Sequence, residues 1–181
     1  MKGREIVLCV TGGIAAYKAA DLASKLRQRE ANVTVAMTEA AQKFVSPLTF
    51  EALTGNAVAT TLWPPQGTRP LDHISLADRA HLVVVAPATA NFLGKAAAGI
   101  ADDVVTTTVL TAFTSVPVLL APAMNNRMWA NPIVQRNVKT LSELGCRIIG
   151  PGEGWLACGV SGEGRMAEVA DIILAIEAAL A

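Results

Sequence analysis

The chain has 181 residues, of which 52% are hydrophobic and 4% aromatic, and its 15 basic side chains balance 15 acidic ones. A chain of this length and composition can bury a substantial core, and we expect one domain spanning residues 1–181. The lack of net charge and the scarcity of aromatic rings argue against a nucleic-acid-binding surface. No nucleic-acid partner is therefore expected.

Targeting and metal-binding signals are also weak. The apolar run at residues 5–10 is too short for a signal peptide, and no run is long enough to span a bilayer. The three cysteines form no CxxC motif, so neither a disulfide framework nor a zinc site is favoured. We expect a cytoplasmic protein without membrane contact or bound metal.

The first third of the chain has a strand–helix–strand pattern. Residues 5–10 form an apolar run, the segment 11–29 has a glycine turn followed by apolar residues at helical spacing, and residues 32–37 form a second buried strand. Such a unit builds a parallel sheet. Two short helical segments and a Pro-rich surface loop follow, at 40–45, 46–55 and 62–72.

The remaining sequence continues the alternation of strands and helices. Strands are predicted at 81–86, 116–121 and 146–150. Helical segments are predicted at 87–112 with a break near Gly99, from Pro132 to Gly145, and at 168–181, with a glycine-rich loop at 151–166. The predicted fold is α/β, a three-layer Rossmann-like (flavodoxin-like) open parallel sheet with helices on both faces.

Polar and glycine-rich clusters follow the predicted strands. They are 11–13, Thr38, 87–91, 122–125 and 150–166. Open parallel sheets bind ligands at the carboxyl ends of their strands. The sequence therefore predicts one ligand site, built from segments that are far apart in the chain.

The first glycine turn suits an anion. Gly12 and Gly13 allow a ligand to approach the start of a helix, where free N–H groups favour a phosphate. The hydroxyls of Thr38 and Thr89 suit a single phosphate, although Thr38 fits a helix N-cap equally well. TGGIAA is not GxGxxG, but Glu39 lies roughly where a ribose-binding acid would, so a nicotinamide cofactor remains a second candidate.

The segment PAMNNRMW, residues 122–129, has the composition of a site wall. Asn125 can bind a carboxylate or an amide, while Met128 and Trp129 supply an apolar lid. The alternative is that Met124, Met128 and Trp129 are core residues and Asn125 caps a helix. Both interpretations remain open from the pattern alone.

Two further side chains could take part in proton transfer. His73 follows the Pro-rich loop and could act as a base or bind a carboxylate. Cys158 lies among glycines and small residues, where packing explains it poorly, and could donate a proton or react. Cys9 and Cys146 lie in predicted strands and are interpreted as small hydrophobic residues.

These motifs resemble those of the homo-oligomeric flavin-containing cysteine decarboxylases, over essentially the whole chain. The matching segments are TGGIAAYKA, His73-Ile74, PATAN, PAMNNRMW and LACGVSGEGRM. PATAN differs from the family's PASAN by one hydroxyl-bearing residue. Within the family, the resemblance is strongest to the branch that serves coenzyme A biosynthesis.

The resemblance implies bound FMN and assigns roles to individual residues. The implied flavin contacts are Gly12, Gly13, Thr38, Thr89, Ala90, Asn91 and Ala123. His73 would be the base or proton shuttle, Asn125 would hold the substrate carboxylate or amide, and Met128 would belong to the same pocket. The family also implies a homo-oligomer, a trimer or dodecamer, with the flavin between subunits.

The implied reaction converts 4'-phosphopantothenoylcysteine to 4'-phosphopantetheine. Oxidation of the cysteine CH2–SH to a thioaldehyde provides an acceptor for the electron pair that CO2 leaves behind, and decarboxylation therefore gives an ene-thiol. Re-reduction then requires a proton donor, which the resemblance assigns to Cys158. In many bacteria a phosphopantothenate–cysteine ligase domain is fused to such a decarboxylase.

Other functions remain as alternatives. The lantibiotic-type members act on a peptide that ends in cysteine, stop at the ene-thiol and need no such donor, so Cys158 favours the coenzyme A branch. A non-catalytic flavin-binding regulatory subunit could lose catalytic residues, whereas His73, Asn125 and Cys158 are all present. The related flavin prenyltransferases are not expected to carry the PAMNNRMW motif.

Overall fold

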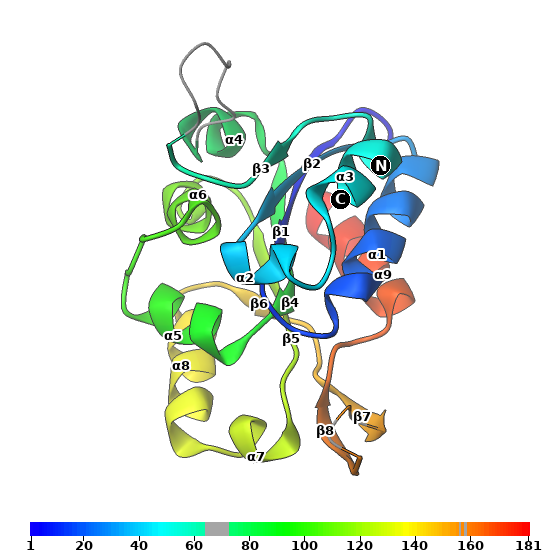
Figure 1. The fold of residues 1–181 in the computed structure, drawn as a ribbon. Coiled ribbons are helices and arrows are strands. Elements are labelled where there is room, and N and C mark those ends of the chain that lie inside the picture. Colours follow the sequence, from blue (N-terminus) through cyan, green and yellow to red (C-terminus); the bar gives the residue numbers. More distant parts are fainter. Residues whose placement is uncertain (64–72, 156, 158) are drawn as a thin grey trace.

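The computed structural model describes residues 1–63, 73–155, 157 and 159–181, in which six parallel strands form one sheet (Figure 1). The strands are β1 Glu5–Val10, β2 Asn32–Met37, β3 Val58–Ala59, β4 Leu82–Ala88, β5 Val118–Pro122 and β6 Arg147–Ile148. Their order is β3-β2-β1-β4-β5-β6. Without the two-residue β3, this is the flavodoxin-like order, so the predicted fold class is confirmed.

Helices cover both faces of the sheet (Figure 1). One face carries α1 Ala16–Gln28, α3 Pro47–Thr54 and α9 Val169–Leu180. The other carries α4 His73–Arg79, α5 Ala90–Ala97, α6 Val104–Ala112 and α8 Pro132–Glu143. Two one-turn helices, α2 Glu39–Gln42 and α7 Asn126–Trp129, follow β2 and β5. Among the helices described, none is long and apolar enough to cross a membrane.

The sheet is buried on both faces, which explains why its strands have continuous apolar runs. In β1, Ile6 and Leu8 pack in the core beneath α1 and α9, whereas Val7 and Cys9 pack beneath the opposite helices. All seven residues of the central strand β4 are buried. Alternation of polar and apolar residues is therefore absent, as expected for a covered parallel sheet.

The segment 151–166, predicted as a loop, contains an antiparallel hairpin, so this prediction was wrong. Its strands are β7 Gly152–Trp155 and β8 Ser161–Arg165. Their sequences, GEGW and SGEGR, lack the apolar alternation that indicates a strand. Two of the glycines, Gly154 and Gly164, have φ angles of 151° and 134°, which side-chain-bearing residues rarely adopt.

Other differences from the sequence predictions are smaller. The helical segment predicted at 87–112 begins late, because β4 continues to Ala88, whereas its predicted break near Gly99 is confirmed by the gap between α5 and α6. The short β3 was not predicted, and α7 was predicted only as the helix that Asn125 would cap. Most of the Pro-rich loop predicted at 62–72 lies outside the described residues.

Two cysteines belong to the core, as their strand positions predicted. Cys9 and Cys146 are buried free thiols. Burial, with a smaller contribution from the charge of Asp103, raises the pKa of the Cys9 thiol. Burial also raises the pKa of Cys146 to about 11. Both thiols therefore remain protonated, and poorly nucleophilic, at neutral pH.

We predict that neither core cysteine reacts rapidly with a disulfide reagent at about pH 8, because the thiolate is the reactive form and both pKa values are raised. The Cys158→Ser variant isolates these two thiols for the measurement. Absorbance should report no fast-reacting thiol in the native variant and both thiols after denaturation in guanidinium. A fast native reaction would contradict the burial of Cys9 and Cys146.

We also predict that Ile172→Ala lowers the free energy of unfolding by about 2–5 kcal/mol, because it leaves a cavity between α9 and the sheet. Ile172 is fully buried, whereas Leu174 on the same helix is 63% exposed. Leu174→Ala is the matched control and should change stability by about 0.5 kcal/mol or less. Urea denaturation of both variants measures the difference, and equal losses would place the wrong face of α9 against the sheet.

Candidate active site

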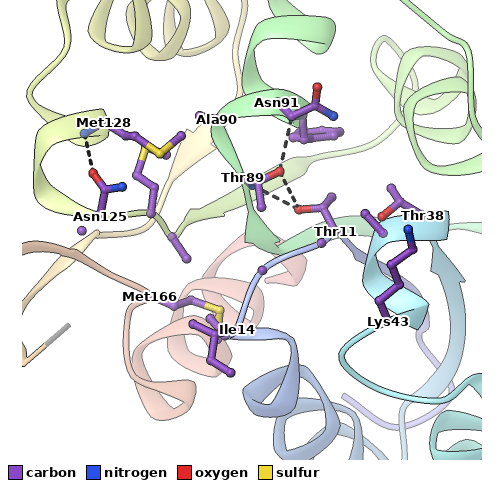
Figure 2. A pocket seen from close by; sticks show the side chains of 18 of the residues that line it. Thr11, Ile14, Thr38, Lys43, Thr89, Ala90, Asn91, Asn125, Met128 and Met166 are labelled. Carbon is purple, nitrogen blue, oxygen red and sulfur yellow. Dashed lines mark hydrogen bonds between the residues drawn. The ribbon is translucent and has the colours of Figure 1, made fainter. Parts of the chain in front are cut away.

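A pocket of about 1010 Å³ opens at the carboxyl ends of the strands. It lies where the chain leaves the neighbouring strands β1 and β4. The connection after β1 runs toward one edge of the sheet, and the connection after β4 runs toward the other. This switch in strand order is the usual ligand site of an open α/β sheet. Figure 2 shows Thr38 and Lys43 on one side, Asn125 and Met128 on the other, and Thr11 and Thr89 between them.

Most of the predicted site residues meet in this pocket. Nine of them line it: Gly12, Gly13, Thr38, Thr89, Ala90, Asn91, Ala123, Asn125 and Met128. They come from the segments that follow β1, β2, β4 and β5. The sheet thus brings together residues that are far apart in sequence, as the clusters at strand ends predicted.

A threonine pair joins the ends of β1 and β4. The buried hydroxyl of Thr11 donates to the Pro87 carbonyl at 2.7 Å and accepts the Thr89 N–H at 3.1 Å. The Thr89 hydroxyl accepts the Phe92 N–H at the start of α5. These bonds fix the two turns that form the floor of the pocket (Figure 2).

The glycine turn after β1 has no room for a side chain at its first glycine. A Cβ on Gly12 would meet the Cβ of Ala40 and lie 2.9 Å from the Ala40 backbone carbon. The helix that follows, α1, begins at Ala16, and its N-cap residue Ala15 provides no side-chain cap. The N–H groups of Ala16 and Lys18 already donate to the Gly13 and Ala15 carbonyls, which leaves the Tyr17 N–H and the helix dipole to bind an anion in the pocket.

The structure confirms the interpretation of Thr38 as a helix N-cap. Its hydroxyl accepts the Ala41 N–H at 3.1 Å and caps α2. The same residue lines the pocket, so the cap and a ligand contact are compatible. Lys43, at the end of α2, also lines the pocket and has no ion-pair partner among the described residues.

Asn125 both caps a helix and faces the pocket. Its Oδ1 accepts the Met128 N–H at 2.8 Å, at the start of α7 (Figure 2). Its Nδ2 amide remains able to donate to a ligand carboxylate or carbonyl. Met128 is 43% exposed, so it is a pocket wall and not a core residue. The interpretation of Met128 as core is therefore wrong, whereas the cap is confirmed.

One end of the pocket is closed by an ion pair that the sequence did not suggest. Lys95 Nζ lies 2.7 and 2.9 Å from the two carboxylate oxygens of Asp102, and 3.7 Å from a carboxylate oxygen of Asp103. The hydrogen bond raises the pKa of Lys95 and lowers that of Asp102. Lys95 thus neutralises one of the two carboxylate charges and ties α5 to the start of α6.

Lys18 is a second charged residue that sequence reasoning missed. Its side chain is 12% exposed, and Nζ lies 3.5 Å from Glu168 Oε2. No described group makes a hydrogen bond with Nζ, so the contact with Glu168 is an ion pair without hydrogen-bond geometry. A buried ammonium group on the pocket wall can take an acceptor from a ligand. The sequence feature that could have indicated Lys18 is its position as one lysine within the apolar start of α1.

Two predicted catalytic residues are not placed in the pocket by this chain. His73 begins α4, which packs against α6 and β1, and it is not among the lining residues. Cys158 lies outside the described residues, although its neighbour Ala157 lines the pocket. The site of one chain thus lacks the histidine that the resemblance made its base.

The pocket edge is unusually apolar for a solvent-facing surface. Ile14 and Tyr17, which line the pocket, are each 60% exposed. Nearby in the chain, Phe44 and Leu48 are 51% and 68% exposed. Large exposed apolar side chains gathered around a site indicate a surface that another molecule covers.

Comparison with known proteins identifies the family. The flavoprotein family model matches residues 1–181. The Coenzyme A biosynthesis bifunctional protein CoaBC of Bacillus subtilis (strain 168) is 51% identical over 173 residues, and that of Escherichia coli (strain K12) is 44% identical over 173 residues. Each match covers 96% of this chain but 42% of the relative. The chain therefore spans less than half the length of these relatives.

Solved structures agree along the whole chain. A PPC decarboxylase mutant complexed with pantothenoylaminoethenethiol has a TM-score of 0.85 at 31% identity, with 98% of both chains covered. The FMN-dependent cysteine decarboxylase SpaF has a TM-score of 0.84 at 38% identity, covering 98% of this chain and 95% of SpaF. The chain therefore belongs to the flavoprotein family.

Proposed function

We propose that the chain is the FMN-dependent decarboxylase that converts 4'-phosphopantothenoylcysteine to 4'-phosphopantetheine and CO2. The observation that carries the proposal is the meeting of the glycine turn after β1 with Asn125 and Met128 in one pocket. An anion site and an amide that can hold a carboxylate are what this cofactor and substrate require. The bifunctional coenzyme A relatives and the PPC decarboxylase structure support the same reaction.

The residues of the pocket fit a flavin mononucleotide. The uncapped start of α1, the close approach at Gly12 and the hydroxyls of Thr38 and Thr89 suit its phosphate. Lys43 adds positive charge on that side. Ala90, Asn91 and Ala123 would contact the rest of the cofactor, because they line the floor between the phosphate side and Asn125.

Substrate binding falls to the opposite side of the pocket. Bound FMN supplies a reversible two-electron oxidation, which lets the cysteine carboxylate leave as CO2. The Asn125 Nδ2 amide donates to the carboxylate or to the adjacent carbonyl, while its Oδ1 remains occupied by the Met128 N–H. Met128 excludes water beside it. Lys18, on the wall formed by α1, places a positive charge beside the anionic cofactor and substrate.

A second copy of the chain completes the site in this proposal. His73, the proposed base, lies outside the pocket of its own chain. The exposed Ile14 and Tyr17 at the pocket edge suit burial against another copy. A homotrimer, or a dodecamer built from trimers, would bring His73 of one copy to the pocket of its neighbour. Cys158 would then supply the proton for re-reduction.

The proposal includes a cellular setting and a partner. We place the reaction in the cytoplasm and residues 1–181 as one decarboxylase unit. The bifunctional name of the CoaBC relatives, of which this chain spans 42%, supports a phosphopantothenate–cysteine ligase domain or protein as partner. That partner would supply the substrate directly.

The decisive experiment compares two substrates with the FMN-reconstituted protein. We expect CO2 release from 4'-phosphopantothenoylcysteine, with 4'-phosphopantetheine as the product detected by mass spectrometry. A peptide ending in cysteine should release little CO2. If only the peptide releases CO2, the chain is a peptidyl-cysteine decarboxylase and this proposal is wrong. If neither substrate releases CO2, the chain binds flavin but does not catalyse the proposed reaction.

Gly12→Ala should weaken FMN binding by at least about tenfold, because the new Cβ would displace α2 and with it Thr38. Gly94→Ala is the matched control, since its Cβ would meet only Asn137 Nδ2 at an ordinary 3.5 Å. Titration of each apoprotein by flavin fluorescence gives both affinities. Equal affinities in the two variants would remove the glycine turn from the cofactor site.

Mixed oligomers test whether His73 comes from a second copy. Asn125→Asp keeps an N-cap but removes the Nδ2 donor, so it should be inactive without loss of fold. His73→Asn should also be inactive. After co-refolding in equal amounts, we expect roughly a quarter of wild-type activity, since each restored site needs intact residues from two copies. No recovery in verified mixed oligomers would place both residues in one chain's site.

A further inference from the structure

The β7–β8 hairpin rests on the loop that carries Asn125, and the contacts come from three consecutive residues of β8. The Gly164 carbonyl accepts the Met124 N–H at 2.9 Å. A Cβ on Gly162 would lie 3.3 Å from the Asn126 Cβ, and one on Gly164 would meet the Met124 carbonyl oxygen. The two glycines thus allow the hairpin backbone to lie directly against the substrate-binding loop.

Glu163, between these glycines, makes a side-chain bond across the same junction. Its Oε2 accepts the indole N–H of Trp129 at 3.2 Å. Trp129 is the last residue of α7, and its carbonyl oxygen accepts the Gln135 amide at 2.6 Å. The short helix α7 is therefore held at its start by the Asn125 cap and at its end by Trp129.

The position of Glu163 is unfavourable for the hairpin by itself. Its cross-strand neighbour in β7 is Glu153, and like charges directly opposite in an antiparallel pair are destabilising. The indole N–H compensates for this by giving the carboxylate a donor from α7. Trp129 is also only partly buried, so core packing alone does not account for it.

The junction lies behind two neighbouring walls of the pocket. Asn125 and Met128 contribute one wall, and Trp155 of β7 and Ala157 contribute the other. We propose that Glu163 and Trp129 form a positioning pair, which sets the spacing of these walls and hence the fit of the substrate. This inference rests on the proposed decarboxylation. Neither residue touches the cofactor or substrate in this role.

Four variants isolate the bond. Glu163→Ala removes the acceptor, Trp129→Phe keeps an aromatic ring but removes the N–H, and Glu163→Gln keeps an amide oxygen as acceptor. Glu153→Ala is the matched control, because it removes the facing carboxylate, which makes no hydrogen bond with a described residue. Each is measured as FMN-loaded protein for KM, kcat, FMN affinity and hydrogen exchange of the hairpin amides.

Glu163→Ala and Trp129→Phe should each raise KM for 4'-phosphopantothenoylcysteine on the order of tenfold, the loss expected for one hydrogen bond to a charged group. FMN affinity should remain unchanged, and hairpin exchange should increase in both, more in Trp129→Phe because Glu163 then still faces Glu153 without its donor. The double variant should be no worse than the poorer single variant, because both remove the same bond. Glu163→Gln and Glu153→Ala should keep KM close to wild type, and hairpin exchange should not increase in Glu153→Ala, which relieves the repulsion from Glu163.

If the KM increases of the two single variants multiply in the double variant, the two residues act independently and the proposal is wrong. Unchanged hairpin exchange in the single variants would also contradict it. A loss of FMN affinity in parallel with KM would also overturn it, since general unfolding would then explain the result. Hydrogen exchange needs no turnover. If the wild-type protein fails to decarboxylate the substrate, the exchange data still decide whether Glu163 holds the hairpin to Trp129.

Discussion

The pairing of β1 with β4 is the constraint on which the pocket depends. Residues 6–9 of β1 pair in register with 82–85 of β4, and Thr11 then bonds the turn that follows β4. The connections from these two strands lead to helices on opposite faces, so their turns separate and leave a space above the sheet. The contacts of Thr11 with Pro87 and Thr89 require that register.

Asn125 illustrates how local and functional demands coincide. A helix of one turn, such as α7, has little stability of its own, so its cap and its contacts with β8 hold it in place. The cap uses the amide oxygen and leaves the amide nitrogen for a ligand. The interpretations of Asn125 as a cap and as a site residue are therefore both consistent with one geometry, because they use different atoms.

The sheet was predictable because burial on both faces makes β1, β2, β4 and β5 continuous apolar runs. The hairpin was not, since β7 and β8 are stabilised by pairing with each other and by backbone contacts with Met124, neither of which produces an apolar pattern. The short helix α7 was indicated only by Asn125 as a possible cap, because four residues are too few to have a helical period.

Within the site, the residues that could be predicted from the sequence are those that lie close to the end of a strand. Thr38, Thr89 and Asn125 come directly after strands, so the parallel sheet alone brings them together. Lys18 lies one turn into α1 and reaches the pocket only because that helix packs against the sheet, next to Glu168 of a distant segment. His73 follows no strand, and no rule of sheet topology brings it to the pocket of its own chain. In the proposed oligomer a second copy would supply this histidine, which gives the fold a physical reason to assemble.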